Sequence, residues 1–156
     1  MSMFKRTVYS IGIFLISAVI AGYSDSKYQQ FVGALYKIFQ GEKLVFFGKY
    51  QLFPTWTFVI SFAISSVIIF NLVLRLKARK KAASIVISAI ALLITLMISS
   101  YVASTILIAE CTICQNGIRT VNYSSIDYDT HAIISLVMAI IASIIYSSHQ
   151  RRKINN

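Results

Sequence analysis

The sequence predicts an all-α membrane protein, built as an up-down bundle of four transmembrane helices with an extracytoplasmic amphipathic helix at the membrane interface. The first observation is that four apolar stretches divide the chain, at residues 8–23, 55–74, 82–109 and 132–147. The second is the composition, with 57% hydrophobic and only 13% charged residues. Soluble domains average about 25% charged residues. The third is the distribution of the basic residues, and together they predict one integral membrane domain over residues 1–156.

The basic residues alternate across the apolar stretches. Ten of them precede the first stretch, separate the second from the third or follow the fourth, and no acid accompanies them: Lys5, Arg6, Arg75, Lys77, Arg79, Lys80, Lys81, Arg151, Arg152 and Lys153. The other two connections hold all five acids. Since excess Lys and Arg marks cytoplasmic loops, we expect a bacterial inner-membrane protein with both termini in the cytoplasm. The Arg75–Lys81 run then indicates orientation and anionic lipid headgroups rather than nucleic acid.

The first stretch, residues 8–23, follows Lys5 and Arg6 and ends near Ala21 and Gly22. Signal peptides share this pattern. No cysteine follows the small residues, as it would in a lipoprotein signal, and the chain begins at Met1. We therefore expect a retained first helix.

An amphipathic helix is predicted over residues 26–40. Its apolar face contains Tyr28, Phe31, Val32, Leu35, Tyr36 and Phe39, at the helical period. Its polar face contains Lys27, Gln29, Gln30, Lys37 and Gln40. Asp25 or Ser26 could cap its start and Gly41 could end it. We expect Tyr28, Phe31, Leu35 and Phe39 to face lipid or a partner, as a lid over the bundle or as a gate. The aromatic residues from Leu44 to Trp56 would continue along the interface.

The remaining three stretches have small or hydroxyl-bearing residues at helical spacing, which favours close helix packing in a bilayer. In the third these are Ser84, Ser88, Ala91, Thr95, Ser99 and Ala103. In the fourth these are Ala132, Ser135, Ala139 and Ser143. The third stretch would be roughly 42 Å long, so it must tilt or project beyond the bilayer. No Asp, Glu, Lys, Arg or His lies inside the four stretches as bounded. This argues against a transporter, since ion-coupled carriers need such groups.

The extracytoplasmic loop at residues 110–130 contains the two cysteines of the chain, Cys111 and Cys114. Their close spacing predicts a redox, metal or structural pair. A zinc site is disfavoured because it needs four ligands, and no metal is expected. In an oxidising compartment the pair should form a disulfide.

The reactivity of the pair depends on its surroundings. Cys111 follows the carboxyl end of a helix and is adjacent to Glu110, and both features raise a thiol pKa. Arg119 and His131 could counteract them if the loop folds back. The redox role, the structural staple, and coincidence or metal binding all stay open, with Cys111 and Cys114 as the candidate catalytic residues. No nucleophile triad, phosphate loop or paired-carboxylate site is found, so a hydrolase is not expected.

The order of these features resembles that of the DoxX/MauE family of small four-helix membrane proteins. The similar features are a short first span, an amphipathic segment with Phe31 and Ala34-Leu35, a second span preceded by Pro54, a basic inner loop, and a close cysteine pair before the fourth span. That family is associated with sulfur and disulfide redox pathways. The resemblance implies a matching role for Cys111 and Cys114. Quinone-coupled disulfide oxidases and vitamin K epoxide reductases offer a second analogy.

Two functions follow as expectations. In the first, a redox-associated protein and accessory thiol–disulfide oxidoreductase exchanges or holds a Cys111–Cys114 disulfide with a periplasmic thiol protein or another membrane subunit. Quinone is then a candidate cofactor. In the second, a non-enzymatic binding protein, such as an immunity protein against a pore-forming toxin, uses the cysteine pair as a structural staple. In both, the lipid bilayer is a partner.

Overall fold

The structure is a computed structural model that describes residues 3–50, 56–74, 76, 78–109 and 118–155. The described residues contain four long α-helices, α1 (Met3–Gln40), α2 (Trp56–Val73), α3 (Ala78–Ala109) and α4 (Tyr128–Asn155). Two short strands, β1 (Leu44–Phe47) and β2 (Arg119–Asn122), and two 3₁₀ turns, Gly41–Lys43 and Tyr123–Ser125, lie between them. All four long helices are long and apolar enough to cross a membrane, as predicted.

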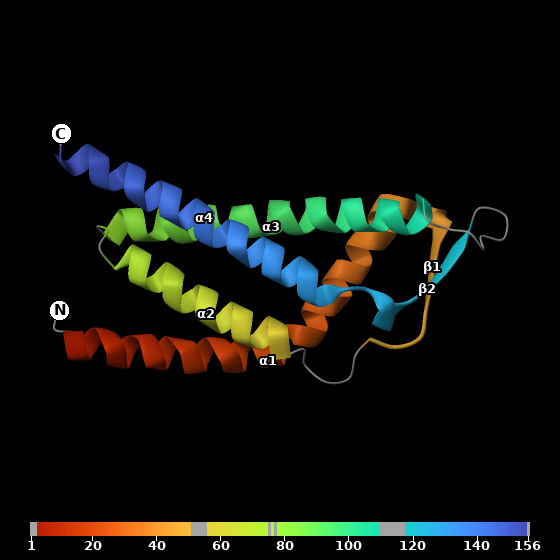
Figure 1. Cartoon of the computed structure of the whole chain (residues 1–156), viewed down its shortest axis with the longest axis horizontal. Helices are drawn as coiled ribbons and strands as arrows, with labels where there is room; N and C mark the ends of the chain where they lie inside the picture. Colours follow the sequence, from red (N-terminus) through yellow and green to blue (C-terminus); the bar gives the residue numbers. More distant parts are fainter. Residues whose placement is uncertain (1–2, 51–55, 75, 77, 110–117, 156) are drawn as a thin grey trace.

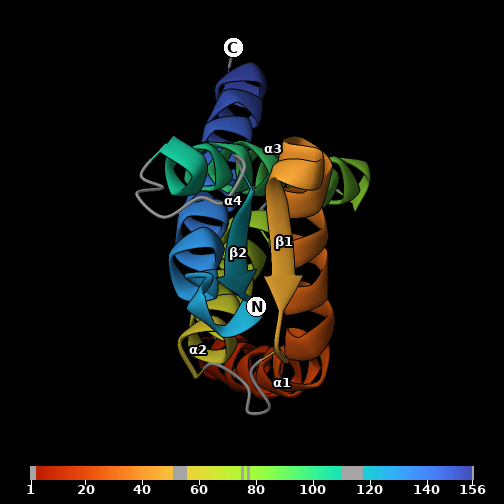
Figure 2. The ribbon, with the colours of Figure 1, turned by 90° about the vertical axis from the view of Figure 1, so that its right-hand side faces the viewer.

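Successive helices reverse direction, and both ends of the chain lie near the connection between α2 and α3 (Figure 1). We call this the basic end of the molecule. At the opposite end, β1 and β2 form a small cap (Figure 2). Helix α4 packs on both α2 and α3, and α1 packs mainly on α2, whereas α2 and α3 make few contacts with each other.

Helix α1 corrects the prediction of two separate helices at 8–23 and 26–40. It is one helix of 38 residues, and it bends partway along its length so that its second half crosses towards the end of α3 (Figure 1). Asp25, which was expected to cap a new helix, instead accepts a hydrogen bond from Gln29 Nε2 at 2.7 Å. This side-chain pair at i, i+4 favours an uninterrupted helix. The predicted end is confirmed: α1 stops at Gln40, and Gly41 has a φ of 55°.

The cap is a two-stranded parallel sheet in which Leu44 pairs with Arg119 and Phe47 with Asn122. The β1 segment was expected along the membrane interface and β2 in the extracytoplasmic loop, and no strand was predicted in either. Leu44 and Val121 are buried in the main core, together with Val32, Leu35 and Leu96 of the helices. The sheet therefore closes the end of the bundle at which α1 and α3 meet.

The small-residue stripes lie largely in the helix interfaces. The α4 stripe is confirmed, since Ala132, Ser135, Ala139 and Ser143 are all buried. On α3, the expected Ser84 and Ser88 are buried, but so are Ser100 and Ser104, which were not in the predicted stripe. A straight repeat of three and four residues drifts around a helix of 3.6 residues per turn. The contact face of α3 therefore moves by one position along its length.

Candidate functional site

The connection with Glu110, Cys111 and Cys114 lies outside the described residues, and its two flanks are described. Helix α3 ends at Ala109 and β2 begins at Arg119. The Arg119 guanidinium donates a hydrogen bond through Nη1 to the carbonyl oxygen of Leu107. The last carbonyls of a helix have no partner within it, so this contact satisfies one of them and ties the two flanks together.

His131 is buried inside the bundle and bonded through both ring nitrogens. In the sequence it directly precedes the fourth apolar stretch, but α4 begins earlier, at Tyr128, and the His131 side chain is only 4% exposed. Its Nε2 lies 2.7 Å from the hydroxyl oxygen of Tyr36 on α1. Its Nδ1 lies 3.0 Å from Ser99 Oγ on α3. One imidazole thus joins three helices.

The hydrogen bonds around His131 have one consistent direction. Ser99 Oγ donates to the carbonyl of Leu96 at 3.1 Å, so its oxygen accepts from His131 Nδ1–H. The other nitrogen, Nε2, then accepts from the Tyr36 hydroxyl. The neutral imidazole with its proton on Nδ1 satisfies every group in the chain. His131 therefore joins the helices, and it lies too deep in the bundle to serve an outer loop as a free base.

A second buried polar pair, Asp25 and Gln29, lies on α1 about two to three helical turns before Tyr36. Asp25 is 3% exposed and Gln29 is fully buried, which corrects the placement of Gln29 on a solvent-facing side. Close by, the Tyr28 ring stacks on Phe58 of α2 with centroids 4.5 Å apart, and its hydroxyl donates to the Tyr128 carbonyl at 2.8 Å. Burying a carboxyl group needs hydrogen-bond partners, and the neighbouring amide supplies one.

The buried face of α1 could have been predicted from a repeat in the sequence. Asp25, Gln29, Val32 and Tyr36 recur at i, i+4, i+7 and i+11, one stripe of a helix, and all four are buried. Three residues of the predicted apolar face, Val32, Leu35 and Tyr36, are buried as well. The buried face of α1 is therefore rotated from the predicted one by roughly 60°, which is less than one residue position.

The four residues predicted to form a partner or lipid surface do not share one exposed surface in the structure. Leu35 is buried in the core, and Tyr28 and Phe39 are partly buried against it. Phe31 is 44% exposed. Of the four residues expected to act together, only Phe31 is exposed.

Aromatic rings pack between the cap and α1, against the core. Tyr123 stacks on Phe46 with ring centroids 4.9 Å apart, and its ring is tilted against that of Tyr50, with centroids 4.3 Å apart. The Lys37 ammonium lies 5.4 Å from the Tyr123 ring centroid, within cation–π range. Burial, together with a hydrogen bond to Tyr123, raises the pKa of Tyr50 to about 12. A tyrosine that stays neutral keeps its phenol available for hydrogen bonding at any physiological pH.

Asp127 caps the start of α4. Its Oδ1 accepts from the Thr130 backbone N–H at 3.0 Å, and its Oδ2 from the Thr130 hydroxyl at 2.6 Å. These hydrogen bonds lower the pKa of the Asp127 carboxyl below its usual value. The capped first turn fixes where α4 begins, and so the depth at which His131 sits. Among the described residues no group of three or more His, Cys, Asp or Glu side chains could hold a metal ion.

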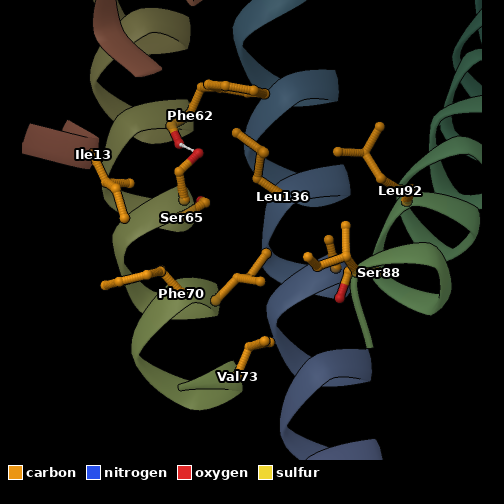
Figure 3. Close-up of a pocket in the computed structure, with 13 residues that line it drawn as sticks. Ile13, Phe62, Ser65, Phe70, Val73, Ser88, Leu92 and Leu136 are labelled. Atoms are coloured by element: carbon orange, nitrogen blue, oxygen red, sulfur yellow. Dashed lines mark hydrogen bonds between the residues drawn. The ribbon is translucent and has the colours of Figure 1, made fainter. Parts of the chain in front are cut away.

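A cavity of about 390 Å³ lies between the helices towards the basic end. Its sides come from α2 (Phe62, Ser65, Phe70 and Val73) and α3 (Ser88 and Leu92), with Leu136 of α4 between them and Ile13 of α1 nearby (Figure 3). The cavity occupies the region in which α2 and α3 contact each other little.

Comparisons with family models, with curated proteins and with solved structures found no match to this chain. The resemblance to the DoxX/MauE family is therefore neither supported nor opposed by them, and stays an expectation. Any function has to be argued from the residues themselves.

Proposed function

We propose that this protein is a multi-pass protein of the bacterial inner membrane that exchanges a Cys111–Cys114 disulfide with a periplasmic thiol protein or a membrane subunit. The observation that carries the proposal is the anchoring of the cysteine connection. The residues on either side of it are tied by the Arg119–Leu107 hydrogen bond and by the sheet of β1 and β2. Both flanks, the end of α3 and the start of β2, lie at the end of the bundle opposite the basic end (Figure 1), so the proposal places the exchange at that end.

A membrane location is supported by the outer surface of the helices. Large apolar side chains are exposed all along them, with Val19 73%, Ile145 64% and Ile98 58% exposed. Soluble monomers rarely expose contiguous apolar patches above a few hundred Å². The basic end carries the cationic segments, so the positive-inside rule puts it in the cytoplasm and the cap in the periplasm. A reporter active only in the periplasm, fused to the C-terminus, should stay silent, and a strong signal would refute this topology.

The proposed exchange is a balanced thiol–disulfide reaction. The Cys111 thiolate attacks a disulfide of the oxidised partner, forms a mixed disulfide and releases one partner thiolate. The Cys114 thiolate then attacks Cys111, which leaves a Cys111–Cys114 disulfide and a reduced partner. In the reverse direction the Cys111–Cys114 disulfide oxidises a partner dithiol and becomes a dithiol itself. A quinone is then the candidate acceptor for the two electrons when the pair is oxidised again. His131 has no part in this proposal, because both of its ring nitrogens are engaged inside the bundle.

The test is a trapping experiment with Cys114→Ser in cells. Without Cys114 the mixed disulfide through Cys111 cannot be resolved, so a reductant-sensitive adduct should accumulate on non-reducing gels. The matched control, in which Cys111 and Cys114 are both serine, should give no adduct. Absence of any adduct from Cys114→Ser, with normal amounts of protein in the membrane, would refute the exchange function.

A binding protein without chemistry, of the kind that protects a membrane against a pore-forming toxin, is the second candidate. It is favoured by the buried polar network, in which Tyr36, His131 and Ser99 are all hydrogen-bonded to one another or to backbone. Such a network stabilises a fixed shape rather than a reaction. In this case the disulfide would be a staple with a reduction potential below about −300 mV. Cys114→Ser would then lose only some stability of the cap.

A further inference from the structure

The cavity at the basic end of the bundle has a wall that is chemically uniform. Its lining is almost wholly apolar, and only serines supply polar atoms. Those hydroxyls are already used within their own helices: Ser65 donates to the Ser61 carbonyl, Ser66 to that of Phe62, and Ser88 to that of Ser84, at 2.7–2.9 Å. No donor on this wall is directed at a ligand. Its occupant must therefore be apolar where it touches the wall.

The length of the cavity matches one leaflet of a bilayer. On α2 the lining runs from Phe62 to Val73, which are roughly 16 Å apart along the helix axis. Half of a hydrocarbon core of about 30 Å is about 15 Å. A flexible hydrocarbon chain of a membrane lipid spans this distance. The cavity volume also falls within the range of about 300–1,000 Å³ that is typical of ligand sites.

Positive charge lies at one end of the cavity. Lys80 and Lys81 stand in the first turn of α3, and Ile85 of the cavity wall follows Lys81 by about one turn. The sequence around them adds Arg75, Lys77 and Arg79, and it contains no acid between Lys43 and Ala109. A basic cluster directly beside a membrane-spanning segment attracts anionic lipid headgroups.

From these three observations, we propose that the cavity binds one acyl chain of an anionic phospholipid, with the lipid phosphate held by Lys80 and Lys81. The acyl chain fills the gap between α2 and α3 and replaces the contacts that these two helices do not make with each other. This site is independent of the cysteine pair, whose flanking elements, the end of α3 and the start of β2, lie at the opposite end of the molecule (Figure 1).

The test uses the full-length protein, purified in detergent, stripped of lipid and titrated with phosphatidylglycerol or phosphatidylcholine under native mass spectrometry. The wild type should bind one phosphatidylglycerol in preference to phosphatidylcholine. Ala89 lines the cavity and is not buried, so Ala89→Trp fills the site without entering the core and should lower phosphatidylglycerol binding at least tenfold. Ile94 is on the same helix, 52% exposed and outside the cavity. The matched control Ile94→Trp should leave binding unchanged.

The charge is tested separately with Lys80→Gln/Lys81→Gln. Each basic residue near a membrane surface contributes about 1 kcal/mol to the binding of anionic lipid, so the double variant should bind phosphatidylglycerol about 30-fold more weakly. Its control is Lys27→Gln/Lys43→Gln, which removes two exposed lysines far from the cavity and should change nothing. If Ala89→Trp fails to fold, Ser66→Phe fills the cavity from α2 instead.

Three results would overturn the proposal. Equal binding of phosphatidylcholine and phosphatidylglycerol would exclude recognition of the anionic headgroup. Unchanged binding in the cavity-filling variants would exclude the acyl chain from the cavity. Displacement of bound lipid by a neutral isoprenoid quinone, with no effect of the lysine variant, would assign the cavity to quinone. None of these outcomes depends on Cys111 or Cys114, so the lipid site and the disulfide exchange stand or fall separately.

Discussion

Tyr36→Phe is the sharpest test of the His131 network, because it removes one oxygen atom and keeps the ring. The Tyr36 hydroxyl is the partner of His131 Nε2, at 2.7 Å, and the Tyr36 side chain is only 2% exposed. In the variant, Nε2 is left buried without a donor. Leaving a buried polar group unsatisfied costs about 1–3 kcal/mol. For a chain of this size, 1 kcal/mol corresponds to about 2–4 °C in Tm.

We therefore expect Tyr36→Phe to lower the apparent Tm by about 2–12 °C, measured as the loss of monodisperse protein on gel filtration after heating in detergent. Tyr23 lies on the same helix and is 90% exposed. The matched control Tyr23→Phe removes the same atom from a site where the hydroxyl can hydrogen-bond to solvent, and its Tm should stay at the wild-type value.

The hydrogen-bond directions around His131 allow a second test of the same network. Ser99→Ala removes the acceptor of His131 Nδ1–H and should also destabilise the protein. Combining it with Tyr36→Phe leaves both ring nitrogens without partners. Groups that share one network are not additive, and their coupling energies reach about 0.5–3 kcal/mol. If Tyr36→Phe behaved like Tyr23→Phe, or the two changes were strictly additive, His131 would not join the three helices as described.

Two further predictions concern the cap and the start of α4. Gly48 has a φ of 81°, and a Cβ there would lie 2.7 Å from Asn122 Oδ1, so Gly48→Ala should lower the Tm. The control Gly12→Ala, whose Cβ would meet nothing within 4 Å, should not lower it. Equal Tm values for the two variants would disprove the close contact at Gly48. Asp127→Ala should cost about 0.5–2 kcal/mol as a lost cap. Because the folded-state pKa of Asp127 is lowered, its contribution is present above the unfolded-state pKa of about 3.9 and is lost as the pH falls through the folded value. The wild type and Asp127→Ala should therefore differ in Tm at pH 7, and the difference should shrink as the pH falls through the folded-state pKa of Asp127. A difference that does not change with pH would contradict the capping role.

Much of the helical architecture could be read from the sequence, because long apolar stretches and glycine at a helix end are local signals. The bounds of α2, predicted at 55–74 and found at Trp56–Val73, depend only on hydropathy and on Pro54 just before them. Gly41 ends α1 because its positive φ suits glycine. These features need no knowledge of distant parts of the chain.

The polar core could not be read in the same way. His131 becomes a buried link only because α4 starts four residues earlier than the hydropathy suggests and brings it between Tyr36 and Ser99. Those residues are 95 and 32 positions away in the sequence, and nothing local connects them. The parallel pairing of β1 with β2 is equally non-local. Four-residue strands carry too short a pattern to distinguish them from interfacial loops.

The parallel sheet also sets the order in which the molecule can be completed. Leu44 of β1 pairs with Arg119 of β2, and all of α2 and α3 lie between these strands in the chain. During synthesis, the backbone groups of β1 therefore have no β2 partner until both of these helices have been synthesised and placed. Contacts between residues so distant in sequence form slowly, because the entropy of closing the intervening loop is lost first. The pairing of β1 with β2 is thus a late step of folding, which follows the placement of the helices that the cap covers.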